Sequence, residues 1–139
     1  ALLDGSGALV EEFIEGTETT CAVWGEGDAA RALPVIEIVS KKGGGFYDFE
    51  AKYAAGGSDH LIPANLSDEI QAQIRQNAEK VHRALGCRGV TRSDFLVTKD
   101  GEIYFLECNT TPGMTETSLV PDAARATGLD FSALVSQLV

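Results

Sequence analysis

The chain has 139 residues, of which 44% are hydrophobic, and a formal net charge of −10. This length allows one hydrophobic core, and no apolar run approaches the roughly 20 residues that a membrane helix needs. Because the charge is acidic and no basic block occurs, the composition disfavours nucleic acid and anionic membranes as partners, and a phosphate-bearing ligand would require local cations.

Two strands are predicted near the start of the chain, over residues 8–14 and 17–24. Both segments are rich in apolar or β-branched residues, and a glycine separates them. A third strand is predicted over 32–39, where Pro34 favours the beginning of the strand or a sheet edge. Strands that follow one another with short turns indicate an antiparallel meander.

From residue 41 to 63 the sequence is irregular, with glycine clusters on both sides of a stretch rich in aromatic residues. Long irregular segments in compact domains are usually functional, so we interpret this one as a lid over a binding site. The triplet Gly43-Gly44-Gly45 is not a phosphate-binding loop, because Gly-Lys-Ser/Thr does not follow it. We interpret it as a hinge or turn.

The clearest helix is predicted over residues 68–85. Ser67 is a suitable N-cap, and Gly86 is a natural residue just beyond the C-terminal end. His82 has no partner at metal-ligand spacing, so we expect it at the helix surface or at the edge of the core. The apolar residues recur at helical spacing and should cover the sheet: Ile70, Ile74, Ala78, Val81 and Leu85.

Two short helices are predicted at the end of the chain. Pro121 fits a first helical turn, Gly128 fits a helix end, and Asp130 can cap a second helix. Together with the strands, these helices predict an α+β fold, a mainly antiparallel sheet flanked by helices.

The three cysteines are odd in number and lack CxxC or zinc-type spacing: Cys21, Cys87 and Cys108. Such cysteines are typical of reduced thiols in the cytoplasm. We therefore expect a cytoplasmic protein.

A hairpin is predicted around the dipeptide Asp100-Gly101. A type I′ turn needs positive φ at both central residues, and Asp-Gly between alternating segments is a strong signal for it. In this turn Lys99 pairs with Glu102, and the count outward from that pair fixes every other pair of the hairpin.

Four polar side chains share one face of the sheet in this register. Asp94 lies opposite Glu107, and Arg92 lies opposite Asn109. Like charges on directly opposed residues destabilise a sheet, so the two carboxylates and the amide oxygen call for a cation. Their all-oxygen chemistry suits Mg²⁺.

An alternative is that Asp94 and Glu107 simply lie on a solvated sheet face with Arg92 nearby, where Arg92 forms an ion pair with Asp94. The predicted neighbours argue against exposure, because Ile103 and Phe105 flank the pair on its own face. The register assigns four residues to the other face: Phe95, Val97, Tyr104 and Leu106. A three-residue or bulged loop would shift the register and weaken the metal interpretation.

Three motifs in the second half of the chain carry a family resemblance: Thr91-Arg92-Ser93-Asp94-Phe95, Leu106-Glu107-Cys108-Asn109-Thr110-Thr111-Pro112-Gly113-Met114-Thr115 and Ser118-Leu119-Val120-Pro121. Read together, they resemble the C-terminal part of D-alanine–D-alanine ligases, which belong to the ATP-grasp superfamily. Two upstream segments, 10–18 and 47–53, resemble the same family in the same order. The resemblance implies that residues 1–139 are the C-terminal portion of an ATP-grasp ligase and are inactive alone.

In that family ATP phosphorylates the carboxylate of one D-alanine, and the amino group of a second D-alanine attacks the acyl phosphate. The resemblance implies two Mg²⁺ ions, or Mn²⁺ as the alternative ion, held by Asp94, Glu107 and Asn109, with Glu107 bridging. This ligand set agrees with the hairpin register.

The resemblance also assigns the groups that act on the reacting atoms. Arg92 would stabilise the acyl phosphate and the developing oxyanion, and Gly113 would offer its backbone N–H to that oxyanion. Ser118 and the Leu119 N–H match the positions that bind the carboxylate of the second substrate.

The resemblance assigns binding of the adenine and ribose of ATP mainly to residues of the early segments. Glu11 and Ile14 match the backbone that meets the adenine edge, and Glu18 matches the carboxylate that binds the ribose. In the matching lid, Lys52 would reach the γ-phosphate and Tyr53 would help to seal the site. The adenine ring would lie among four apolar side chains: Phe13, Phe46, Leu96 and Leu106.

The resemblance implies a cytoplasmic enzyme of peptidoglycan precursor synthesis, a homodimer at full length, with D-alanine and ATP as its small-molecule partners. A tyrosine at position 53 resembles the ligases that use D-alanine, rather than D-lactate, as the second substrate. The alternatives are another ATP-grasp carboxylate–amine ligase or D-alanine–D-lactate ligase, and a non-catalytic module that only binds Mg-ATP.

Overall fold

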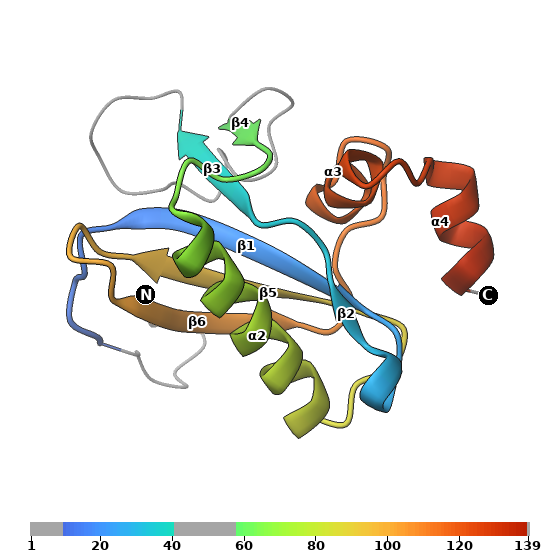
Figure 1. The fold of residues 1–139 in the computed structure, drawn as a ribbon, viewed down its shortest axis with the longest axis horizontal. Coiled ribbons are helices and arrows are strands. Elements are labelled where there is room, and N and C mark those ends of the chain that lie inside the picture. The colour runs from blue at the N-terminus through green and yellow to red at the C-terminus, as the bar shows by residue number, and fades with distance from the viewer. Residues whose placement is uncertain (1–9, 41–57, 139) are drawn as a thin grey trace, which may run out of the picture.

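The structure, a computed structural model, describes residues 10–40 and 58–138. Six strands form one antiparallel sheet in the order β4-β3-β1-β5-β6, with β2 paired to β1 (Figure 1). The strands are β1 (Thr17–Trp24), β2 (Arg31–Ala32), β3 (Ile36–Ser40), β4 (Ser58–Leu61), β5 (Val90–Val97) and β6 (Ile103–Asn109). The central strand β1 pairs with β5 over its whole length.

Helices cover both faces of the sheet. They are α2 (Asp68–Ala84), α3 (Leu119–Ala126) and α4 (Phe131–Leu138), and a 3₁₀ turn, η1 (Gly27–Ala29), follows β1. Because side chains alternate along a strand, Cys21 of β1 packs with Ile74 of α2, whereas its neighbour Ala22 packs with Val120 of α3. The predicted α+β architecture is therefore confirmed, with one hydrophobic cluster on each face.

The strand predicted over 17–24 is confirmed as β1, but the one predicted over 8–14 is wrong for the part that the structure describes. Residues 10–16 are irregular, and Val10 and Phe13 are each 89% exposed. Apolar composition alone does not hold a strand without a neighbouring strand to bond its backbone.

The strand predicted over 32–39 is two strands, β2 and β3, interrupted around Pro34. Proline has no N–H to donate to the ladder, so pairing with β1 lapses there. The interruption is anchored on both sides, since the Leu33 N–H donates to the Ala22 carbonyl at 2.8 Å and the Ala64 N–H donates to the Val35 carbonyl at 2.9 Å.

The segment predicted to be irregular from 41 to 63 contains strand β4, which pairs with β3 through Ile38 and His60 among others. This part of the prediction is wrong, because residues 58–61 have a free edge of β3 to pair with. Residues 41–57, including the glycine triplet, lie outside the described part of the chain.

Helix α2 is confirmed, with the Ser67 hydroxyl accepting the Ile70 N–H and Gly86 at φ 63° beyond its end. Its buried stripe differs from the prediction, since Leu85 is 60% exposed whereas Gln71 and His82 are buried. His82 is fully buried because both ring nitrogens have partners, the Thr91 hydroxyl at 2.8 Å and the Gly25 carbonyl at 3.2 Å.

The two C-terminal helices are also confirmed. Pro121 occupies the first turn of α3, and Gly128 follows that helix at φ 87°. The Asp130 carboxylate accepts the Ala133 N–H at 2.8 Å and so caps α4. Within residues 10–40 and 58–138, none of the helices has both the length and the apolar character that crossing a bilayer requires.

Glu79 joins α2 to the sheet and gives a test of this packing. Its carboxylate accepts the Ala32 N–H at 3.0 Å and a guanidinium N–H of Arg83 at 3.0 Å. Burial acts to raise the pKa of Glu79, but these bonds outweigh burial and lower the pKa below its ordinary value. The stabilisation is therefore present above the ordinary pKa and is lost as pH falls through the lowered one.

We predict that Glu79→Ala lowers the free energy of unfolding by about 1 kcal/mol at neutral pH, because a backbone donor loses its acceptor. Urea unfolding at several pH values measures this difference, which should shrink in acid. Gln76→Ala, on the exposed side of the same helix, is the control. An equal loss in both variants, or a difference that grows in acid, would contradict the role of Glu79.

Candidate functional site

The hairpin of β5 and β6 differs from the predicted one at two points. Its turn is a three-residue loop, in which the Gly101 N–H donates to the Thr98 carbonyl and the Thr98 N–H donates to the Glu102 carbonyl, each at 2.9 Å. Gly101 has φ 85°, a value that glycine adopts easily. The predicted type I′ turn, with Lys99 paired to Glu102, is therefore wrong by one residue.

A β-bulge then restores the predicted register. Val97 pairs with Ile103 and Phe95 with Phe105, but a shift between Asp94 and Phe95 makes Leu106 an additional residue of β6. Beyond the bulge the pairing is the predicted one. The one-residue offset of the turn and the one-residue offset of the bulge cancel.

Asp94 pairs with Glu107, and Arg92 pairs with Asn109, as the sequence predicted. Arg92 also pairs with Ala22 of β1, which packs against α3. The four polar residues therefore lie on the sheet face that α3 covers, and we call them the β5–β6 polar cluster: Arg92, Asp94, Glu107 and Asn109.

The predicted neighbours of this cluster are wrong. Ile103 packs with the α2 cluster, and the Phe105 ring meets Phe95 edge-on at 5.7 Å, so both belong to the opposite face. Tyr104 pairs with Leu96 on the cluster's own face. The three-residue turn causes this exchange, because it displaces each residue of β6 between the turn and the bulge by one position.

The Asp94 carboxylate accepts three hydrogen bonds from neighbouring side chains. Arg92 Nε donates to Asp94 Oδ1 at 3.0 Å and Arg92 Nη2 donates to Oδ2 at 2.9 Å, while the Thr20 hydroxyl donates to Oδ1 at 2.5 Å. Such a bidentate guanidinium pair is strong and fixes orientation. The alternative in which Arg92 neutralises Asp94 is therefore the arrangement present in this structure.

The other two residues of the cluster differ in their engagement. Asn109 Oδ1 accepts the Thr111 N–H at 3.0 Å, which fixes the chain as it leaves β6. Glu107 is exposed and makes no side-chain hydrogen bond or ion pair with the described residues. The expectation of a shielded acidic pair is thus wrong for Glu107.

The donor set suits a hard cation in chemistry. Within residues 10–40 and 58–138 no three His, Cys, Asp or Glu side chains gather closely enough to hold an ion, so an ion here would rest on two carboxylates and an amide. Two carboxylate oxygens offer about four lone pairs, so the three bonds to Asp94 leave it able to accept a further partner. Glu107 and the second lone pair of Asn109 Oδ1 would complete an all-oxygen set.

Three of the residues predicted to bind adenine and ribose lie toward the turn end of the hairpin: Glu18, Leu96 and Leu106. Glu18 pairs with Leu96, one step along the face from Asp94. Leu106 is 49% exposed at the bulge, and Leu96 is partly buried. Their apolar surface is accessible beside the acidic cluster.

The irregular segment 10–16 passes against this same end. A Cβ at Gly16 would lie 2.7 Å from the Val97 carbonyl oxygen, so glycine permits the close approach. A hydrogen bond to Glu102 at 2.8 Å and the nearby charge of Glu12 raise the pKa of Tyr104 on β6. The segment that carries the predicted residues thus runs beside the hairpin: Glu11, Phe13 and Ile14.

At the other end of the cluster, the loop 110–118 leads to α3. A Cβ at Gly113 would lie 3.0 Å from Ser118 Oγ, so these two predicted residues are adjacent. The buried Pro112 and the partly buried Met114 anchor the loop. Leu119 is the first residue of α3. The remaining predicted residues, Phe46, Lys52 and Tyr53, lie outside the described part of the chain.

Two contacts near the site were not predicted from the sequence. Thr20 holds Asp94 across 74 residues of sequence, and His60 Nδ1 lies 2.8 Å from Asp122 Oδ2 across 62 residues. No local pattern marks either contact, since both depend on which strands pair.

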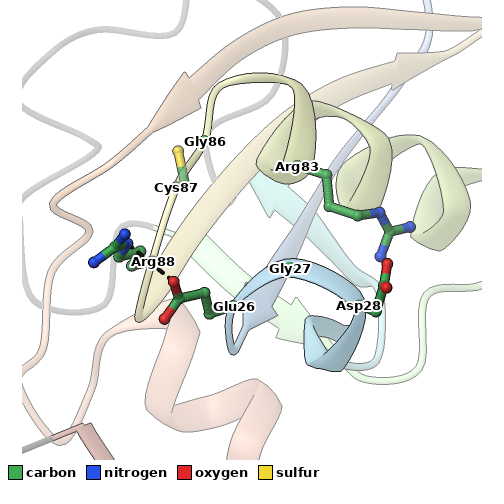
Figure 2. Close-up of a pocket in the computed structure, with 7 residues that line it drawn as sticks. All are labelled: Glu26, Gly27, Asp28, Arg83, Gly86, Cys87 and Arg88. Atoms are coloured by element: carbon green, nitrogen blue, oxygen red, sulfur yellow. Dashed lines mark ion pairs between the residues drawn. The ribbon is translucent and has the colours of Figure 1, made fainter.

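A surface pocket of about 310 Å³ lies away from the cluster, between the turn after β1 and the end of α2 (Figure 2). Its two arginines are already ion-paired, Arg88 with Glu26 and Arg83 with Glu79, each at 3.0 Å. This pocket therefore adds no unpaired cation to the candidate site.

Comparisons with known proteins agree with the geometry. Residues 3–139 match a family described as "D-ala D-ala ligase C-terminus". The chain is 52% identical to a D-alanine–D-alanine ligase of Pelotomaculum thermopropionicum over 95% of its own length and 41% of that protein. The chain spans about two fifths of the length of the curated relatives that it matches.

Solved structures of two ligases are also similar to this chain in fold and sequence. The VanG D-Ala:D-Ser ligase of Enterococcus faecalis has a TM-score of 0.73 and 37% identity, covering 91% of this chain and 36% of that one. The D-alanine–D-alanine ligase of Bacillus anthracis, solved in complex with ATP, has a TM-score of 0.71 and 30% identity, covering 92% and 38%.

The two adjacent threonines of β1 give a matched test of the cluster. We predict that Thr20→Val lowers the free energy of unfolding by roughly 1–3 kcal/mol, because the Asp94 carboxylate loses a buried donor. Thr19→Val is the control, since Thr19 is equally buried on the other face and its hydroxyl reaches only the Phe95 carbonyl at 3.4 Å. Urea unfolding of the two variants should differ, and equal losses would show that Thr20 does not support Asp94.

Proposed function

The chain belongs to the D-Ala–D-Ala ligase C-terminal family, and we propose that the protein containing it joins two D-alanines at the expense of ATP. The product would be the D-alanyl-D-alanine unit of peptidoglycan precursors. The observation that carries this proposal is the β5–β6 polar cluster, which sets two carboxylates, an amide and a guanidinium side by side.

The order of residues along one sheet face supports the proposal. Residues 96, 94 and 92 of β5 follow one another on that face at intervals of about 7 Å. They run from the exposed apolar end, through the acidic residues, to the loop that contains Gly113. An adenine, its phosphates and an acceptor carboxylate could occupy these three zones in the same order.

Arg92 and Gly113 would act on the reacting atoms. Arg92 keeps its charge at every physiological pH, and its guanidinium carries five donors, so it can pair with Asp94 and also face an acyl phosphate. The Gly113 N–H would stabilise the oxyanion that forms when the second amine attacks. Ser118 and the Leu119 N–H would hold the carboxylate of that second D-alanine.

Asp94, Glu107 and Asn109 would hold two Mg²⁺ ions, or Mn²⁺ in their place. When bound, such ions neutralise charge on the β- and γ-phosphates of ATP during phosphoryl transfer. For its part, Arg92 orients the Asp94 carboxylate through two bonds, and Thr20 fixes the same carboxylate from the neighbouring strand.

The remaining assignments rest on the family. Glu11, Ile14 and Glu18 would meet adenine and ribose, and the base would lie among Phe13, Phe46, Leu96 and Leu106. Lys52 and Tyr53 would close over the γ-phosphate. We also propose that the whole protein is a cytoplasmic homodimer, and that residues 1–139 alone lack turnover because the first substrate is held elsewhere in the protein.

One observation favours a second candidate product. A matched structure is described as a D-Ala:D-Ser ligase, and its sequence is 37% identical to this chain. The more similar curated relatives, at about 50% identity, are D-alanine–D-alanine ligases. The choice between D-alanine and D-serine therefore concerns the second substrate only.

We predict that the full-length protein releases phosphate from ATP when D-alanine and Mg²⁺ are present, and forms D-alanyl-D-alanine. Mass spectrometry of the product identifies the second substrate when D-alanine, D-serine and D-lactate compete at neutral pH. D-alanine should dominate, because a tyrosine, Tyr53, occupies the matching lid position. A dominant D-serine or D-lactate product would reject the D-alanine assignment.

We predict that Glu107→Gln in the full-length protein lowers kcat by roughly a hundredfold or more, because an outright loss of a metal ligand costs at least as much as loss of its supporting shell. The fold should persist, since Glu107 makes no side-chain bond with the described residues. Glu102→Gln, at the turn of the same hairpin, is the control and should retain turnover. Unchanged turnover in Glu107→Gln would remove this residue from the metal site.

A further inference from the structure

The residue that precedes α3 has an unusual role for a helix N-cap. Ser118 does not cap α3 with its side chain. Its hydroxyl turns back to the loop, accepting the Thr115 N–H at 3.0 Å and lying 2.8 Å from the Thr115 hydroxyl. The N–H groups in the first turn of α3 are therefore not capped by the Ser118 side chain. The position of Ser118 depends instead on its contacts with the loop 113–118.

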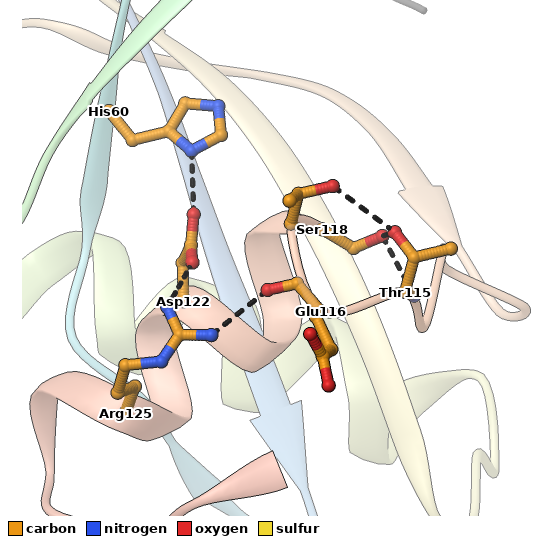
Figure 3. A network of polar contacts seen from close by, with 7 residues as sticks. His60, Thr115, Glu116, Ser118, Asp122 and Arg125 are labelled. Atoms are coloured by element: carbon orange, nitrogen blue, oxygen red, sulfur yellow. Dashed lines mark hydrogen bonds and ion pairs between the residues drawn. The ribbon is translucent and has the colours of Figure 1, made fainter. Parts of the chain in front are cut away.

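The loop is held in turn by a chain of polar contacts, which we call the Asp122 brace (Figure 3). Arg125 donates from Nη2 to the Glu116 carbonyl at 2.9 Å and from Nη1 to Asp122 Oδ1 at 2.7 Å. The other oxygen of Asp122 accepts from His60 Nδ1 of β4 at 2.8 Å. The brace thus connects the loop, helix α3 and strand β4.

Two of the three side chains of the brace are partly buried, whereas the Arg125 side chain is 56% exposed. The side chains of Asp122 and His60 are only 18% and 24% exposed. Asp122 has its charge one turn inside α3, where a carboxylate would repel an anion bound at the helix start. Arg125 offsets that charge, and both Asp122 oxygens are turned to partners of the brace. Ser118 therefore faces the loop without an unpaired carboxylate beside it.

We propose that Asp122, held between His60 and Arg125, is a positioning residue that fixes the loop 113–118 for the second substrate's carboxylate. This inference rests on the proposed function, in which Ser118 and the Leu119 N–H bind that carboxylate. The brace contacts the loop through the Glu116 carbonyl, and within residues 10–40 and 58–138 none of its hydrogen bonds or ion pairs reaches the β5–β6 polar cluster. Loss of the brace should therefore weaken binding of the second substrate and leave binding of ATP and of the first D-alanine unchanged.

The chain offers a matched pair of variants. Arg125 and Arg83 are both helical arginines that are ion-paired to a carboxylate about one turn earlier, Arg125 to Asp122 and Arg83 to Glu79. They lie on helices that cover opposite faces of the sheet. Arg125→Gln breaks the brace, whereas Arg83→Gln removes a comparable ion pair away from the loop.

In the full-length protein, Arg125→Gln should raise the KM for the second D-alanine by roughly tenfold. The KM values for ATP and the first D-alanine should stay within about twofold of the wild type. Arg83→Gln should leave all three unchanged. Arg125→Lys should recover only part of the affinity, because lysine can pair with Asp122 but lacks the fork that also reaches the Glu116 carbonyl.

Hydrogen exchange of the same proteins gives a readout that a merely stabilising role would not move. Arg125→Gln should accelerate exchange at residues 113–118, with no comparable change there in Arg83→Gln. If Arg125→Gln does not fold, Asp122→Asn, which keeps the shape of the side chain, takes its place with the same expected results.

An unchanged KM for the second D-alanine, or a raised KM without faster exchange in the loop, overturns the positioning role. A full-length wild-type protein that makes no dipeptide instead overturns the proposed function. In that case the claim about the second substrate fails together with the proposed function. The link between Arg125 and the loop is then rejected as well if Arg125→Gln does not change hydrogen exchange at residues 113–118.

Discussion

The pairing of β5 with β6 is the constraint on which the candidate site depends. It sets Asp94 opposite Glu107 and Arg92 opposite Asn109 on one sheet face. Two irregularities produce this register together, a three-residue turn and a bulge that makes Leu106 an additional residue. Either irregularity alone would displace one strand by one residue and turn the acidic side chains to opposite faces. The site therefore depends on a compensation between two local features of one hairpin.

The rest of the fold supports this hairpin from both sides. The central strand β1 pairs with β5 throughout, and its Thr20 reaches Asp94 directly. Helix α2 packs beneath the opposite face, while α3 packs over the face that carries the cluster. The loop from Asn109 to α3 is thus fixed at one end by the sheet, through the Asn109 amide, and near the other by the Asp122 brace.

The sequence predicted those parts of the fold that local patterns determine. Strand β1, helix α2 and both C-terminal helices follow from periodicity and capping residues, and the pairing of Asp94 with Glu107 was predicted as well. That pairing was predicted through the wrong turn, because nothing distinguishes Leu106 from its apolar neighbours as a bulge residue. Residues 10–14 show the converse, since their composition is typical of a strand but β-structure also needs a partner. The contacts of Thr20 and of the Asp122 brace depend on strand order, which no local pattern encodes.

We propose that the oxygens brought together by this hairpin hold divalent cations. Anomalous scattering from Mn²⁺, in crystals of the full-length protein grown with a nonhydrolysable ATP analogue, tests it most directly. Mn²⁺ should lie at about 2.1 Å from oxygens of Asp94, Glu107 and Asn109, a distance typical of a small hard cation. Mn²⁺ bound elsewhere, with Arg92 as the sole cation at Asp94, would contradict it.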